Sequence, residues 1–410
     1  MTAVRSGTSD GSSGPRLPSH VYVHVPFCAS KCAYCDFYSV PSADAAAVDA
    51  YFQRLHAEVK RWATLDLLGT VETIYFGGGT PSSVAEGVAQ TLVRICSLLP
   101  VAPDAEIAVE ANPESASEAV LALLADAGFG RVSLGVQSLD DAVLAWLGRK
   151  HDAHEALAAV HAAAQAGMTV SADLICGVPA QSTASWRESV RTIAASGVGH
   201  TSVYPLTVEE GTPLEARIRS RAAAEPDPDA AADMMLSAER ILSEAGFSRY
   251  EVANWARSEA ERSRHNTAYW TGASYLGLGP AAHGMLDHAT AKAACLAPCS
   301  PHTARVRYAN PSELDAWRAG EPPVIEELTA AEALREDVML GLRLVEGVED
   351  ALVEAAGVLD ALVGLERDGL VQHGAGRWHT TERGWLLGNE VFSRVWCAST
   401  DEVPGTPEGS

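Results

Sequence analysis

The feature that most restricts the fold of this chain is a regular alternation of short apolar runs and helical stretches. Each unit has a β-branched or aromatic run, a turn with glycine or proline, and an Ala- and Leu-rich segment with helical spacing. The strands are expected at Val21–Val25, Val71–Phe76, Ile107–Glu110, Arg131–Val136, Thr169–Ile175 and Thr201–Leu206. The helices are expected near residues 44–62, 84–98, 115–127, 153–166 and 183–195. Such alternation requires right-handed crossovers and a parallel sheet, so the sequence predicts an α/β fold with an incomplete barrel of six strand–helix units.

Polar or conformationally unusual segments follow five of these strands. They are a group of cysteines, then Gly77–Pro81, Glu110–Pro113, Gln137 and Asp173–Pro179. Barrel enzymes carry their sites on the face formed by the C-terminal ends of the strands. The sequence therefore predicts one site assembled from five successive loops.

The rest of the chain predicts a second, smaller domain and two flexible tails. The expected ranges are a tail at 1–18, a core at 19–284, a linker at 285–323, a C-terminal domain at 324–397 and a tail at 398–410. The tails are polar and rich in small residues, and the linker has scattered Pro, Ala and Cys without clear periodicity. In the C-terminal domain, helical patterns precede two short strands at Leu370–Gln372 and Trp378–Thr380, which predicts a winged-helix-like α+β module.

Composition limits the cellular setting and the partners. The formal net charge is −23 with a pI near 4.9, and no Lys/Arg run is present, so a nucleic-acid partner is not expected. No segment reaches roughly 18 consecutive apolar residues, and no export signal is recognisable, which predicts a cytoplasmic protein without an integral membrane segment. The eight cysteines should then be reduced thiols that can bind metal.

Three of these cysteines lie within eight residues, in Cys28-Ala-Ser-Lys-Cys32-Ala-Tyr-Cys35. Thiolates are the usual ligands of iron–sulfur clusters, and three of them leave one iron of a 4Fe-4S cluster open for a cofactor or substrate. Structural zinc is the alternative, and it would need a fourth ligand from a pair such as Cys295 and Cys299. That pair lies far along the chain in a segment without other zinc-finger character.

The other loops suggest a ligand beside the cysteines. Gly77–Gly79 would let backbone groups approach a ligand without interference from a Cβ atom. Glu110 could accept hydrogen bonds from an ammonium group or a ribose, whereas Gln137, Arg149 and Asp173 suit ribose, carboxylate and adenine edges. The alternative for each polar residue is a satisfied group that caps a strand or helix.

The cysteine spacing, with Tyr34 beside the last thiol, resembles the motif of the radical-SAM superfamily. Longer segments resemble the oxygen-independent coproporphyrinogen III oxidase group of that superfamily and, within it, the HemW-type heme chaperones. The matching segments are Tyr22–Cys28, Cys35–Phe37, Gly77–Ser82, Glu110–Pro113, Arg131–Ser138, Asp173–Pro179, Tyr250–Val252 and His265–Trp270. Departures are Cys176, where an aromatic residue is commoner, and Ala281, where glycine is usual.

The resemblance implies a 4Fe-4S cluster on Cys28, Cys32 and Cys35, reduced by an electron donor. It also implies that S-adenosylmethionine chelates the open iron and is cleaved to a 5′-deoxyadenosyl radical, chemistry that belongs to the cofactor. The cofactor residues carried across from the family are Tyr22, Gly78, Gly79, Thr80, Glu110, Gln137, Arg149 and Asp173. Several of them serve a second S-adenosylmethionine in the oxidase, so one molecule is the expectation here.

Two motifs separate the branches of the family. The oxidase carries a further cysteine two residues after the third ligand, where this chain has Phe37. The chaperones have Asp-Phe there and add a His-Asn-x-x-Tyr-Trp motif, found here as His265–Trp270. The resemblance therefore implies a chaperone that delivers heme to an apo-protein, with respiratory proteins as candidate acceptors. The alternative is the oxidase, which decarboxylates coproporphyrinogen III to protoporphyrinogen IX.

His265 is the first candidate for heme ligation, because Tyr269 and Trp270 beside it offer aromatic faces to a flat porphyrin. His24, near the cysteine loop, and His283, in a Gly-containing turn, are the alternatives. Because the motif follows the barrel in the sequence, heme and cluster are expected to occupy separable sites.

Overall fold

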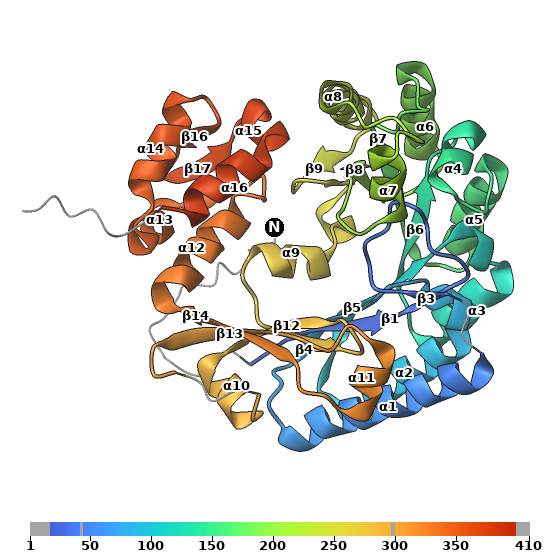
Figure 1. Ribbon diagram of the computed structural model, residues 1–410, viewed down its shortest axis with the longest axis vertical. Coiled ribbons are helices and arrows are strands. Elements are labelled where there is room, and N and C mark those ends of the chain that lie inside the picture. Colours follow the sequence, from blue (N-terminus) through green and yellow to red (C-terminus); the bar gives the residue numbers. More distant parts are fainter. Residues whose placement is uncertain (1–16, 42–43, 297–299, 399–410) are drawn as a thin grey trace, which may run out of the picture.

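The computed structural model describes residues 17–41, 44–296 and 300–398, through which runs an open sheet of twelve strands (Figure 1). Most of both predicted tails, and Cys299, therefore lie outside the described residues. Six central strands pair in parallel, each with the next: β1 (His20–Val25), β4 (Val71–Gly78), β5 (Val101–Ala111), β6 (Arg131–Gln137), β7 (Thr169–Cys176) and β8 (His200–Pro205). This curved sheet confirms the predicted incomplete barrel.

Helices cover the outer face of this sheet (Figure 1). They are α1 (Ala45–Leu65), α2 (Ala85–Leu98), α3 (Glu118–Ala127), α4 (Asp141–Leu147), α5 (Ala153–Gln165), α6 (Thr183–Ala195) and α8 (Pro228–Glu244). Side chains of Asp44, Ser117 and Asp152 begin three of them by accepting a backbone N–H of the first turn. In β1, Val21 and Val23 are fully buried, whereas the alternate residues Tyr22 and His24 make polar contacts with each other. Strand alternation thus sends apolar groups to one face and polar groups to the other.

The sheet continues past both ends of the six-stranded part. Beyond β8 lie β10 (Asn254–Ala256) and β9 (Ser248–Arg249), and beyond β1 lie β11 (Tyr275–Leu278), β12 (His283–Asp287), β13 (Thr303–Ala309) and β14 (Val324–Thr329). The range predicted as a linker, 285–323, is therefore not structureless, since it contributes β13, α10 (His288–Ala293) and α11 (Leu314–Ala319). In β13 the buried Val306 and Tyr308 alternate with Arg305 and Arg307, which bind carboxylates of α12 (Ala330–Gly341), and this period-2 alternation is a strand signal that the sequence interpretation overlooked.

The C-terminal part is a small α+β unit with its own apolar core (Figure 1, orange to red). Three helices, α12, α13 (Asp350–Ala356) and α14 (Leu359–Arg367), precede the hairpin of β16 (Val371–Gly374) and β17 (Arg377–Thr380), as predicted. The short β15 (Val348–Glu349) pairs with β17, and α15 (Glu382–Leu386) and α16 (Gly388–Trp396) follow. The domain boundaries themselves stay a prediction.

Aromatic and cationic side chains connect this unit to the barrel. The Trp385 indole donates to the carbonyl of Val252 at 2.7 Å. The Arg343 guanidinium lies 4.9 Å from the ring centroid of Trp270 and 4.3 Å from that of Phe392. Trp270 ends α9 (Arg264–Trp270), so the helix that carries the His-Asn-x-x-Tyr-Trp motif contacts both parts of the molecule. In the described part of the chain, no helix is both long and apolar enough to cross a bilayer.

The backbone explains why glycine is usual at position 281. Ala281 lies at φ 55°, in the left-handed region that costs a residue with a Cβ atom roughly 1–2 kcal/mol. We expect Ala281→Gly to raise the free energy of unfolding by about 0.5–1 kcal/mol, after the larger entropy of the unfolded glycine chain is subtracted. The matched control Ala282→Gly, at a buried neighbour outside that region, should lower it. Urea denaturation decides, and equal destabilisation by both substitutions would contradict the explanation.

Candidate functional site

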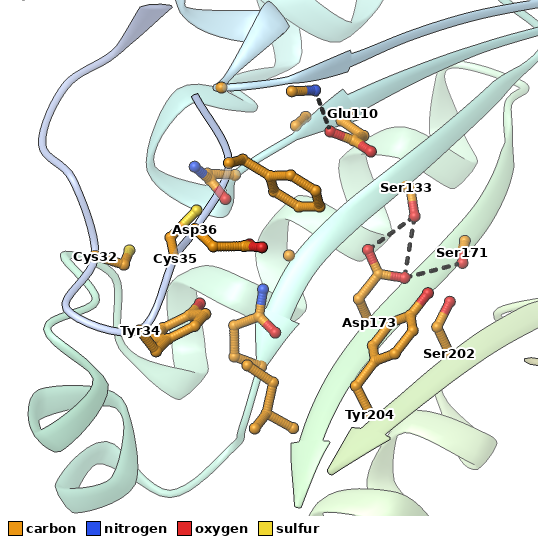
Figure 2. A pocket seen from close by; sticks show the side chains of 18 of the residues that line it. Cys32, Tyr34, Cys35, Asp36, Glu110, Ser133, Ser171, Asp173, Ser202 and Tyr204 are labelled. Atoms are coloured by element: carbon orange, nitrogen blue, oxygen red, sulfur yellow. Dashed lines mark hydrogen bonds between the residues drawn. The ribbon is translucent and has the colours of Figure 1, made fainter. Parts of the chain in front are cut away.

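A cavity of about 510 Å³ opens at the C-terminal ends of the central strands and extends into the barrel. The cysteine loop forms one wall, and strands β5 to β8 carry the polar side chains of the other (Figure 2). Nine of the residues predicted from the sequence line it: Cys28, Cys32, Cys35, Gly78, Gly79, Glu110, Gln137, Arg149 and Asp173. Thr80 lies beside it, lining a small outer pocket, and Tyr22 lies behind Tyr75 with the two rings stacked. The predicted residues are thus brought together in space.

The cysteine loop is fastened at both ends and in its middle. Its ends pair as two short parallel strands, β2 (Phe27–Cys28) and β3 (Val40–Pro41). The His24 imidazole binds the carbonyl of Tyr38 at 2.9 Å, and the carbonyl of Ala33 accepts a backbone N–H from the first turn of α7 (Pro213–Arg219) at 2.8 Å. These contacts hold the three thiols at the mouth of the cavity.

Two of the thiols have polar partners. Cys28 Sγ lies 3.5 Å from the Thr80 hydroxyl, and Arg149 Nη1 lies 3.5 Å from Cys32 Sγ. Burial raises the pKa of Cys28, and it raises the pKa of Cys35 to about 11. Without a metal the thiols of Cys28 and Cys35 are therefore protonated at neutral pH, and metal binding must release these two protons.

The donor set fits an iron–sulfur cluster better than a single ion. Among the described residues, no three His, Cys, Asp or Glu side chains gather closely enough to bind one metal ion. A cluster, in contrast, takes each thiolate on a different iron atom. Arg149 adds a cation whose Nε is buried without a hydrogen-bond partner in the described structure, as expected beside an anionic group. Cys295, the candidate fourth zinc ligand, is exposed and does not line the cavity.

The glycine loop leaves no room for side chains. Gly78 has φ 109°, and a Cβ atom there would overlap the His24 ring, whereas one on Gly79 would lie 2.7 Å from the carbonyl oxygen of Phe27. The two glycines therefore let this loop pack closely against His24 and the start of the cysteine loop. The Gly78 N–H donates to Glu110 at 2.9 Å, and the Tyr75 hydroxyl donates to the same carboxylate at 2.9 Å. Burial nevertheless raises the pKa of Glu110 to about 7.

A second, half-buried carboxylate lies deeper in the barrel. Asp173 accepts hydrogen bonds from Ser133 at 2.9 Å and from Ser171 at 3.4 Å (Figure 2). Burial raises the pKa of Asp173 as well. Gln137, at the end of β6, has φ 63°, a strained conformation for a residue with a side chain that is typical of functional sites.

Helix α9 closes the inner end of the cavity through Ser263 and Asn266. His265 is 1% exposed and does not line the cavity. Its Nδ1 binds the Thr73 hydroxyl at 2.7 Å, and its Nε2 binds the Tyr269 hydroxyl at 3.0 Å. Burial lowers the pKa of His265 to about 3. Both ring nitrogens are engaged, so neither is free for heme iron in this conformation.

The two alternative histidines, His24 and His283, differ in whether their ring nitrogens are already hydrogen-bonded. His24 is buried, and both of its nitrogens are bound, one to the Tyr22 hydroxyl at 3.1 Å and one to the Tyr38 carbonyl. His283 is exposed at the start of β12, and its ring has no hydrogen bond within the described residues. Of these three candidates, His283 has the ring available for ligation.

Sequence reasoning missed several residues that line the inner cavity. Arg131 pairs with Glu106 at 3.7 Å, and the His200 ring is bound by the hydroxyls of Ser171 at 2.7 Å and Tyr250 at 2.9 Å. The available signal was alternation, because polar residues stand two positions apart in each strand: Arg131 and Ser133 in β6, Ser171 and Asp173 in β7, and His200 and Ser202 in β8. In a strand this pattern places them all on one face. Asn112, inside the matched Glu110–Pro113 segment, was also not assigned a role.

Comparisons with known proteins identify the family of the chain. Residues 22–193 match the family model for the radical SAM superfamily, and residues 328–387 match the HemN C-terminal domain. The chain is 38% identical to the heme chaperone HemW of Mycobacterium tuberculosis over 92% of this chain and 94% of that protein. It is 31% identical to HemW of Bacillus subtilis over 90% and 97%.

Among solved structures, the coproporphyrinogen III oxidase HemN of Escherichia coli, described as a radical SAM enzyme, has a similar fold. The TM-score is 0.77 at 21% identity, over 93% of this chain and 91% of that one. At this identity the likeness establishes the fold alone, whereas the HemW relatives are similar over nearly their whole length. This chain belongs to the HemW family of the radical SAM superfamily.

Proposed function

We propose that this protein binds a 4Fe-4S cluster, S-adenosylmethionine and heme, and delivers the heme to an acceptor apo-protein. The observation that best supports binding of the cluster and S-adenosylmethionine is the lining of the cavity. The loop that fastens Cys28, Cys32 and Cys35 faces a wall with two half-buried carboxylates, Glu110 and Asp173. S-Adenosylmethionine carries a sulfonium and an ammonium group, and carboxylates in a cavity that is partly shielded from water attract such cations.

The roles of the remaining residues follow from their positions. A reduced cluster of this kind supplies one electron to a bound sulfonium compound, and an external electron donor must restore it. The Gly78–Gly79 backbone accommodates the methionine end, and Glu110 accepts hydrogen bonds from it. Arg149 pairs with a carboxylate, and Gln137 and Asp173 accept from the ribose and adenine.

The proposal that this protein binds heme is supported by the names of its relatives and by the available imidazole of His283. The relatives over nearly the whole chain are named heme chaperones. Neutral imidazole is a common ligand of heme iron, and it needs an unengaged nitrogen. We therefore assign heme ligation to His283 in place of His265, whose ring is held by Thr73 and Tyr269.

The oxidase is the second candidate, because the fold resembles HemN. Against it stands Phe37, which occupies the position of the oxidase's additional cysteine. Its ring is 59% exposed and lines the cavity. A phenyl group offers neither a thiol nor a proton, so it cannot replace that cysteine chemically.

The raised pKa of Glu110 predicts a pH-dependent affinity for S-adenosylmethionine. Above about 7 the carboxylate is ionised and can hold a cation, and below that pH it is protonated, so affinity should fall as the pH is lowered. Glu110→Gln should weaken binding roughly tenfold at pH 8, the value of one charge-assisted hydrogen bond, and should flatten the profile. Calorimetric titration of anaerobically reconstituted protein from pH 6 to 8.5 measures both.

The control for this prediction is Glu118→Gln, which neutralises an exposed carboxylate of α3 that does not line the cavity. It should keep the affinity and the pH profile of the unsubstituted protein. Ionisation of the ligand's own amino group affects all three proteins alike, so only a difference between them reports on Glu110. Identical profiles for Glu110→Gln and the unsubstituted protein would contradict the assignment.

The proposed function is tested by offering hemin and coproporphyrinogen III to the reconstituted protein in parallel anaerobic assays. We expect a Soret band that titrates with hemin, and no protoporphyrinogen IX by mass spectrometry, even with S-adenosylmethionine and a strong reductant. His283→Ala should weaken heme binding or shift the Soret band, because alanine offers no donor. His265→Gln, which keeps one donor and one acceptor, should retain the original spectrum.

Both the heme-binding assay and the coproporphyrinogen III assay have a result that would contradict the proposal. Repeated turnover of coproporphyrinogen III would favour the oxidase. An unchanged spectrum and affinity in His283→Ala, together with an altered spectrum in His265→Gln, would return heme ligation to His265. The iron content of each variant, measured in the same samples, separates a lost ligand from a lost cluster.

A further inference from the structure

A chain of hydrogen bonds in the cavity wall joins two of the three cysteines. The Thr80 hydroxyl lies 3.5 Å from Cys28 Sγ and accepts a hydrogen bond from the Asn112 amide nitrogen at 2.9 Å. The Asn112 amide oxygen accepts from Arg149 Nη2 at 2.5 Å, and Arg149 Nη1 lies 3.5 Å from Cys32 Sγ. Asn112 is the central member of this chain.

The chemistry of the members fixes the orientation of the Asn112 amide. A guanidinium has only donors, so Arg149 must face the oxygen of the Asn112 amide and leave its nitrogen for Thr80. Because the Thr80 oxygen then accepts from this nitrogen, its own single hydrogen is free to point at the Cys28 sulfur. Arg149 is held in place by a further bond to the Gly135 carbonyl at 2.9 Å.

The neighbouring strand is shaped for this arrangement. A Cβ atom on Gly135 of β6 would lie 2.8 Å from the Asn112 amide oxygen and 3.4 Å from Arg149 Nη2. The absence of a side chain there lets the amide and the guanidinium meet. Arg149 and Asn112 also line both the main cavity and the small outer pocket, so the chain forms part of the partition between them.

We propose that Asn112 is a positioning residue that directs the Thr80 hydroxyl and the Arg149 guanidinium at the sulfurs of Cys28 and Cys32, and thereby raises the reduction potential of the cluster. This inference rests on the proposed cluster. Donors and positive charge directed at ligand sulfurs favour the reduced state, which carries one more negative charge. Asn112 does so without touching the cluster ligands itself.

Two substitutions of Asn112 separate this role from simple packing. Asn112→Ala frees the Thr80 hydroxyl to rotate and removes one anchor of Arg149. Asn112→Asp is nearly isosteric, but its carboxylate draws the Thr80 hydrogen away from Cys28 and neutralises Arg149. Both variants should have a more negative midpoint potential, and Asn112→Asp the more negative of the two.

The measurement is an anaerobic redox titration of reconstituted protein without S-adenosylmethionine, followed by EPR, with iron content and apo-protein melting in parallel. At the midpoint of the unsubstituted protein, the reduced-to-oxidised ratio of Asn112→Asp should fall about fivefold or more, the factor of one modest hydrogen bond. Ser82→Ala is the control, since Ser82 is buried two residues after Thr80 and its hydroxyl binds that of Ser115 at 2.6 Å, away from the cysteines. Its potential should not move.

Gly135→Ala provides a test that leaves Asn112 in place, because the added methyl group displaces the amide from Arg149. Gly135→Ala should shift the midpoint potential in the same direction. If Asn112→Ala does not retain a cluster, the potential of Gly135→Ala is compared with that of the unsubstituted protein instead. Wild-type midpoints in Asn112→Asp and Gly135→Ala would overturn the inference and leave the proposed function intact. A lack of any cluster in the unsubstituted protein would instead contradict the proposed function, and this is seen before any variant is compared.

Discussion

The parallel pairing of β1 with β4 is the interaction on which the rest of the site depends. Its register sets His24 opposite Gly77 and Val25 opposite Gly78, so the cysteine loop and the glycine loop leave the sheet side by side. A slip of one residue would turn Tyr22 and His24 toward the helices and the buried valines toward the cavity. The bonds from the Gly79 N–H to Val25 and from the Thr80 N–H to Phe27 continue this pairing into the loops and lock it.

The motif helix α9 connects the two parts of the molecule to the cavity. Its Asn266 lines the inner end of the cavity, its buried His265 is held against β4 through Thr73, and its Trp270 stacks on Arg343 near the C-terminal unit. The sequence suggests a separate heme site because α9 follows the barrel along the chain. In space α9 closes the inner end of the cavity through Asn266 and also contacts Arg343 through Trp270, so the motif is part of the cavity wall and is not remote from it.

Strand–helix alternation predicted the barrel well because each strand has one apolar face, and the expected elements agree with the observed ones to within a few residues at most ends. In strand β13 the alternation of Arg305 and Arg307 with buried apolar residues was a usable signal that was overlooked, whereas the carboxylates that pair with these arginines lie on α12, about thirty residues away. The spacing of residues along the chain also predicted correctly that the cysteines and the loops after the next strands lie at one site. It could not show that His265 is engaged by Thr73, which lies far earlier in the chain, or that Asn112 lies between two cysteine partners. Such contacts depend on the register of neighbouring strands, which no local pattern contains.

The central claim is that Cys28, Cys32 and Cys35 hold one cluster at the mouth of the cavity. The most direct measurement is the iron content and EPR spectrum of anaerobically reconstituted Cys→Ser variants at all three positions, with Cys176→Ser and Cys295→Ser as controls. We predict about four irons per chain in the unsubstituted protein and both controls, and loss of iron and signal in each variant of the three. Retention of the cluster in Cys32→Ser together with its loss in Cys295→Ser would contradict the account.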